Sequence, residues 1–110
     1  TWTCSDLSSD ALAFTVTAAK YTKIGRVVHI TLHFAFPVTT GVQPVKIGTL
    51  PFAVVGNAGM AVGYNNNGAV VNPLLADGTS EIQMQSVAGV VYTNINMSNS
   101  TFVLSGYYFV

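Results

Sequence analysis

The sequence predicts an antiparallel all-β domain, a sandwich or barrel of roughly eight strands. Clusters of Gly, Pro, Asn and Ser recur roughly every 8–12 residues, which is the turn spacing of such folds. The segments between the clusters alternate apolar and polar residues, and no helix-length window repeats apolar residues with helical periodicity. A chain of 110 residues has the size of one domain, so we expect a single domain over residues 1–110.

The first predicted strand carries an apolar row at Leu12, Phe14, Val16 and Ala18. Alanine and threonine residues alternate with this row. Because successive side chains of a strand point to opposite faces, the apolar row is expected to face the core.

The clearest strand is predicted from Arg26 to Phe36. Its polar face carries His29 and His33, and we expect this face to be an outer or subunit-contact face. Pro37 has no amide hydrogen for a central ladder, so the strand should end there. The residues predicted to face the core are Val28, Ile30, Leu32, Phe34 and Phe36.

Two later strands follow the same period. In the first, Ile82 and Met84 alternate with polar residues. The last strand, over residues 101–110, is apolar or aromatic on both faces, which is typical of a central strand or of one pressed against a neighbouring subunit. Its predicted oligomer-contact residues are Val103, Tyr107 and Phe109. Turns are predicted at Gly41, Asn65-Asn66-Asn67-Gly68, Asp77-Gly78 and Ala88-Gly89.

The charge content is unusually low. Charged residues make up 7% of the chain, four basic and four acidic, whereas about 25% is typical of a soluble domain. Such thin charged cover predicts an obligate oligomer. A net charge of zero excludes a nucleic-acid-binding protein, which needs a basic stripe. No apolar run approaches the ~20 residues that a membrane-spanning helix requires, so no membrane insertion is expected.

The sequence gives little support to a catalytic or metal site. His29 and His33 share one strand face but lie roughly 13 Å apart, too far to bind one ion. Cys4 is the single cysteine, which rules out an internal disulfide and argues against structural zinc. Asp77 and Glu81 flank a turn, and we interpret them as a turn former and a strand-edge residue. We therefore expect no catalytic residue, no metal and no cofactor.

Several predicted loops combine aromatic rings with uncharged amides. Neutral sugars are bound by this chemistry, because their CH groups stack on rings while amides bond to hydroxyl groups. The alternative is that asparagine and glycine only satisfy the turn geometry. The predicted glycan-binding residues are Tyr64, Asn65, Asn66, Asp77, Tyr92 and Asn94.

Four short phrases occur in order along nearly the whole chain. They are Thr1-Trp2-Thr3, Tyr21-Thr22-Lys23-Ile24-Gly25-Arg26-Val27, Ile47-Gly48-Thr49-Leu50-Pro51-Phe52 and Ser105-Gly106-Tyr107-Tyr108. In this order they resemble the C-terminal β-sandwich domain of tail fibres and tailspikes of tailed bacteriophages. The resemblance implies a homotrimer of jelly-roll-like sandwiches at the distal end of a fibre, located in the virion and assembled in the cytoplasm of the bacterial host.

Members of that family trimerise, bind the host surface, or do both. The chain starts at Thr1 rather than at methionine, so we expect it to be a piece of a longer fibre or tailspike protein. The leading interpretation is a non-catalytic domain that binds bacterial surface polysaccharide and trimerises. The alternatives are a purely structural trimerisation cap, part of a polysaccharide depolymerase whose catalysis lies elsewhere in the parent chain, and a hydrolase with its active site between subunits.

Overall fold

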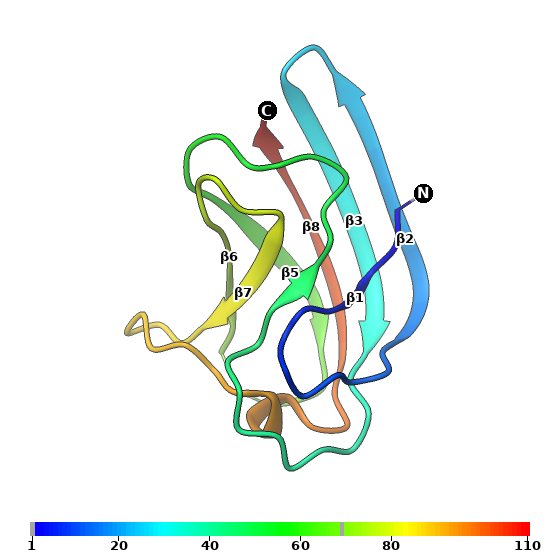
Figure 1. The fold of residues 1–110 in the computed structure, drawn as a ribbon, viewed down its shortest axis with the longest axis vertical. Helices are drawn as coiled ribbons and strands as arrows, with labels where there is room; N and C mark the ends of the chain where they lie inside the picture. Colours follow the sequence, from blue (N-terminus) through cyan, green and yellow to red (C-terminus); the bar gives the residue numbers. More distant parts are fainter. Residues whose placement is uncertain (1, 69) are drawn as a thin grey trace.

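The computed structural model describes residues 2–68 and 70–110; Thr1, which opens the first of the four phrases, lies outside them. Within these residues, eight strands form one antiparallel sheet that curls into a half-barrel, with almost no helix (Figure 1). The strands run in the order β1-β4-β7-β6-β5-β8-β3-β2 across the sheet. Along the chain the elements are β1 (Ser5–Asp6), β2 (Thr15–Ile24), β3 (Val27–Ala35), β4 (Ile47–Gly48), β5 (Ala58–Asn65), β6 (Asn72–Leu75), β7 (Glu81–Gln85), the 3₁₀ turn η1 (Asn94–Met97) and β8 (Thr101–Phe109).

The prediction for β3 is confirmed. All five residues expected on its inner face are buried, and Phe34 packs its ring against those of Phe14, Phe36 and Phe102. β3 ends at Ala35, two residues before Pro37. The long alternating pattern identified this strand because one of its faces lies against the core along its full length.

The predicted face of β2 is wrong beyond Thr15. An irregularity between Val16 and Ala18 shifts the register against β3 by one residue. A one-residue shift moves every following side chain to the other face, so Ala19 is buried while Val16 is exposed. Leu12 and Phe14, which precede the shift, still pack against the core as predicted.

β5 joins the two halves of the curled sheet. Its first residues pair with β6, and its later residues pair with β8. The inner side chains of both halves meet in one core cluster, which includes Ile82 and Met84 of β7 as predicted. β8 buries Phe102, Leu104 and Tyr108 in the same core.

Two kinds of glycine shape the loops. Gly68, Gly78 and Gly89 have positive φ angles of 84°, 76° and 79°, as the predicted turns require. Gly41 instead lies in an irregular loop, where a Cβ atom would collide with the carboxylate of Asp10.

The N-terminal segment closes part of the free edge of β2. Trp2 is buried, its backbone N–H donates to the carbonyl of Ala19, and its indole N–H donates to the carbonyl of Lys20. Trp2 is therefore a core residue. No helix among the described residues is long and apolar enough to cross a membrane.

Candidate functional site: the loop end and the outer face

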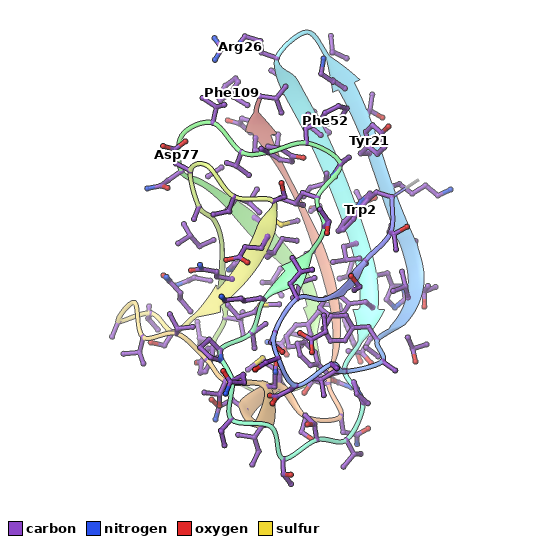
Figure 2. All side chains as sticks on the ribbon, viewed as in Figure 1. Trp2, Tyr21, Arg26, Phe52, Asp77 and Phe109 are labelled. Carbon is purple, nitrogen blue, oxygen red and sulfur yellow. The ribbon has the colours of Figure 1, made fainter. Side chains whose placement is uncertain are left out.

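Five of the six predicted glycan-binding residues lie at one end of the molecule. We call this region, formed by residues 36–46, 64–68 and 86–100, the loop end. Its η1 turn and the loop after β3 lie at the lower end in Figure 1, and the loop that follows β7 projects to the left. The sixth residue, Asp77, lies in the β6–β7 turn at the opposite end, where Figure 2 labels it. The predicted residues at the loop end are Tyr64, Asn65, Asn66, Tyr92 and Asn94.

The asparagines at the end of β5 and just after it bond to the chain itself. Oδ1 of Asn65 accepts from the N–H of Asn67 at 2.8 Å, and Oδ1 of Asn66 accepts from the N–H of Thr101 at 2.8 Å. The Nδ2 group of Asn67 donates to the carbonyl of Asn96 at 2.9 Å and to Oγ of Ser100 at 2.7 Å. These bonds fix the 65–68 loop to η1 and to the start of β8.

Asn94 is fully buried and ties η1 to the N-terminal loop. Its Nδ2 group donates to Oγ of Ser8 at 2.9 Å and to Oδ2 of Asp10 at 2.8 Å. Its Oδ1 atom has no hydrogen-bond partner among the described residues. In this conformation Asn94 stabilises the loop end and offers no surface to a ligand.

The other predicted residues have mixed environments. The hydroxyl of Tyr92 donates to the carbonyl of Val70 at 2.9 Å. Asp77 accepts from the N–H of Gly56 at 2.9 Å at the far end of the molecule. Tyr64 is 54% exposed, so it is the open aromatic ring of the loop end. A ligand at this end would meet Tyr64, the exposed Asn66 and a group of exposed aliphatic residues that sequence reasoning did not single out: Val38, Val42, Val87, Val90 and Ile95.

A second candidate surface lies on the outer side of β2, β3, β8 and β5. We call it the outer face. It consists of the side chains of these strands that point away from the core, and the strand register sets them opposite one another in rows. Three rows cross the strands in sequence. The apolar row contains Ile24, Val27 and Phe109, the ring row contains Thr22, His29 and Tyr107, and the polar row contains Lys20, Thr31 and Ser105.

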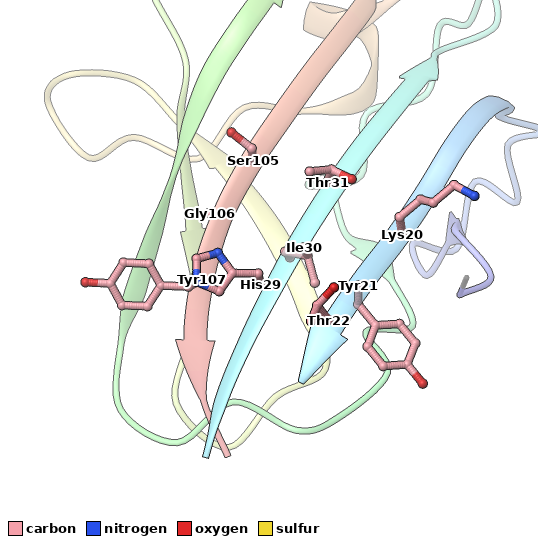
Figure 3. Close-up of a pocket in the computed structure, with 9 residues that line it drawn as sticks. All are labelled: Lys20, Tyr21, Thr22, His29, Ile30, Thr31, Ser105, Gly106 and Tyr107. Carbon is pink, nitrogen blue, oxygen red and sulfur yellow. The ribbon is translucent and has the colours of Figure 1, made fainter. Parts of the chain in front are cut away.

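A shallow groove of about 270 Å³ lies between the ring row and the polar row, and Figure 3 shows the side chains that line it. Tyr107 on β8 and Lys20 on β2 stand on either side of β3. The side chains of Lys20, Thr31 and Ser105 make no hydrogen bond or ion pair within the described part of the chain.

Aromatic contacts order the ring row. The rings of His29 and Tyr107 are 5.6 Å apart between centroids, and Phe109 meets Tyr107 edge-on at 6.1 Å. Tyr107 nevertheless remains 54% exposed. The apolar row is also open, because Ile24 is 72% and Phe109 46% exposed. Val55, which bridges to Phe109, extends this row.

The charged side chains of the β2–β3 hairpin extend in different directions. Lys23 lies over the ring of Phe52, with 5.6 Å from Nζ to the ring centroid, away from the outer face. Nε of Arg26 donates to the carbonyl of Val110 at 3.0 Å. Lys20 is therefore the one charged side chain in the three rows, and no carboxylate stands among them.

The interface residues that the sequence predicts are distributed over this face. Phe109 belongs to the apolar row and Tyr107 to the ring row, while Val103 is only partly exposed beside Gly63. The groove itself was not predicted, because its lining comes from three separate segments. The pairing of β2 with β3 and the register of β3 against β8 bring these segments together, and neither was predicted from the sequence.

The described residues contain neither an activated cysteine nor a metal-ligating cluster. Burial raises the pKa of the Cys4 thiol to about 12, so its reactive thiolate is suppressed at neutral pH. No group of three or more His, Cys, Asp or Glu side chains comes together in the described part of the chain. Comparison of the chain with protein-family models, with curated proteins and with solved structures found no match.

Proposed function

We propose that the chain is a non-catalytic end domain of a phage tail fibre or tailspike that self-associates and binds a bacterial surface glycan. The resemblance of the four sequence phrases supplies the family, and the open apolar row of the outer face carries the proposal. In this proposal, the curled sheet is a jelly-roll-like sandwich, and three copies of the chain form a cyclic trimer.

The apolar row supports self-association because it exposes large hydrophobic groups to water. Ile24, Val55 and Phe109 are 72%, 49% and 46% exposed. Removing apolar surface from water is favourable by about 25 cal/mol per Å², and this gain offsets part of the entropy lost on association. A chain with 7% charged residues has few groups that oppose such contact. A second copy of the chain is therefore the occupant that we assign to this row.

The number of copies comes from the resemblance, since the apolar row alone fits a dimer equally well. A contact between unlike patches closes into a ring when the rotation between subunits permits it. Tyr107, two residues before Phe109 on β8, would border the contact, whereas Val103 lies six residues from Phe109 along the strand.

Glycan binding is assigned to the loop end. Tyr64 offers an open ring and Asn66 an exposed amide, within loops that hydrogen bonds hold in place. A site of this kind binds a sugar weakly, on the order of millimolar. Three such sites on one trimer would raise the apparent affinity for a repeating polysaccharide by about a hundredfold.

Light scattering tests self-association. The wild-type chain should show three times its mass of 11.6 kDa at micromolar concentration. A variant with Ile24→Ser and Phe109→Ser should lose the trimer, whereas Ile95→Ser, at a residue of similar exposure (44%) in the loop end, should keep it. A wild-type mass near 11.6 kDa would overturn the trimer.

Binding to purified host polysaccharide tests the remaining part of the proposal. The trimer should bind the polysaccharide, and Tyr64→Ala should weaken binding without changing the mass. No binding would leave a trimerisation cap as the function. New reducing ends on the polysaccharide would instead indicate a hydrolase.

A further inference from the structure

We propose that the groove of the outer face binds one acidic pyranose unit, a sugar whose ring carries a carboxylate. This site is separate from the loop end and extends the proposed function. It rests on the proposed function in one respect, because it takes the ligand to be a saccharide. The apolar row borders the groove but does not line it, so contact between copies along that row is compatible with an open groove.

The size of the groove fits one sugar unit. Its volume of about 270 Å³ lies just under the roughly 300 Å³ at which small-molecule pockets begin. It is open to solvent along the sheet, so a polysaccharide chain could continue beyond the bound unit. The proposed ligand is therefore one residue within a longer glycan.

The charge of the groove favours an anion. Lys20 carries an ammonium group that no carboxylate within the described residues neutralises, and the three rows contain no acidic side chain. All four acidic residues of the chain lie elsewhere, in β1, the loop after β1, the β6–β7 turn and β7. A carboxylate in the groove would find one opposite charge and no like charge.

The other lining groups suit the rest of a sugar. The hydroxyl groups of Thr31 and Ser105 have no partner within the described chain, so they can bond to ring hydroxyls without breaking existing contacts. The half-exposed ring of Tyr107 is held from the side by Phe109 and can stack against the CH face of a pyranose.

The placement of these groups gives the bound unit a direction. β2 and β8 flank β3, so their backbones are about 10 Å apart. Figure 3 shows that Tyr107 and Lys20 extend to opposite sides of the groove, with Thr31 and Ser105 between them. A pyranose over Thr31 and Ser105 would place one edge on the side of Tyr107 and its carboxylate on the side of Lys20.

Amide-resolved NMR titration with two matched probes tests the proposal. The probes are a trisaccharide of galacturonic acid and the neutral trisaccharide of galactose with the same linkage. The acidic probe should shift the amide signals of Thr31, Ser105 and Tyr107, and bind about two- to fivefold more tightly than the neutral one, as one exposed ion pair allows. High salt should reduce this preference.

Variants separate the contributions. Lys20→Gln should remove the preference for the acidic probe, and Tyr107→Ala should weaken both probes. Lys23→Gln is the matched control, because Lys23 lies on the same strand but over Phe52, and it should bind as the wild type does.

Shifts confined to loop-end signals such as those of Tyr64 and Asn66 would overturn the groove site while supporting the proposed function. Equal affinity for both probes, or an equal effect of the Lys20 and Lys23 variants, would also overturn it. Saturating probe that shifts no signal at either site would contradict both proposals.

Discussion

The loop end and the outer face use polar side chains in opposite ways. At the loop end, the amides of Asn66, Asn67 and Asn94 bond to the chain itself and hold loops together. On the outer face, Lys20, Thr31 and Ser105 have no partner within the described chain. A polar residue in a loop therefore says little about ligand binding until its hydrogen bonds are known.

The difference has a backbone origin. A strand satisfies its own N–H and C=O groups by pairing, so its outward side chains are not needed for that purpose. An irregular loop leaves backbone groups without a ladder partner, and asparagine side chains take that role. Substitutions in the two regions should consequently affect stability by very different amounts.

The largest effect is expected for Asn94→Ala. This change removes the donor to Ser8 and to the Asp10 carboxylate inside a buried site. We expect the free energy of unfolding to fall by about 2–3 kcal/mol, because bonds to a charged group are the strong ones. Thermal or urea unfolding would measure it; Asn94→Asp should be at least as harmful, since it places a second carboxylate beside Asp10.

Gly41→Ala should destabilise the same region by about 1–3 kcal/mol. Its new Cβ would displace the Asp10 carboxylate, which also accepts from the N–H of Gln43. Gly63→Ala on the outer side of β5 is the control, because its Cβ would meet only ordinary contacts with Val103 at 3.6 Å and beyond. Equal midpoints of urea unfolding for the two variants would show that the close approach of Gly41 to Asp10 does not contribute to stability.

Asn66→Ala should cost about 1 kcal/mol, the usual net contribution of one hydrogen bond. Its Oδ1 atom accepts from the N–H of Thr101, at the start of β8. Amide hydrogen exchange at Thr101 would quicken in the variant. An unchanged exchange rate there would mean that water replaces the side chain without loss.

The smallest effect is expected in the groove. Thr31→Ala and Ser105→Ala should each change the free energy of unfolding by less than about 0.5 kcal/mol, because neither hydroxyl is bonded within the described chain. A loss above about 1 kcal/mol would show that these groups serve the fold rather than a ligand. Chemical denaturation followed by tryptophan fluorescence is sufficient, since Trp2 is buried.

The sequence predicted β3, β7 and β8 well because each presents one unbroken apolar face to the core. It failed on the face of β2 because a one-residue irregularity between Val16 and Ala18 has no clear signature in residue types. Tertiary pairing, which residue patterns do not encode locally, decides such a shift.

The candidate sites were predicted less completely. Turn signals located Asp77 and the 65–68 loop, but they do not say which end of a sheet a turn occupies, and the two lie at opposite ends. The groove depends on the register that brings Thr22, His29 and Tyr107 into one row. That register joins segments far apart in the chain, so no local motif could reveal it.

Hydroxyl-radical footprinting tests most directly the claim that a second copy covers the apolar row of the outer face while the loop end stays open. Phe109 and Ile95 have nearly equal exposure in the single chain, 46% and 44%. After correction for the intrinsic reactivity of each residue type, we predict that Phe109 in the wild-type protein is modified several-fold less than Ile95. Ile24→Ser should restore the modification of Phe109. Equal modification of Phe109 and Ile95 in the wild-type protein, or protection of Ile95 alone, would contradict the account.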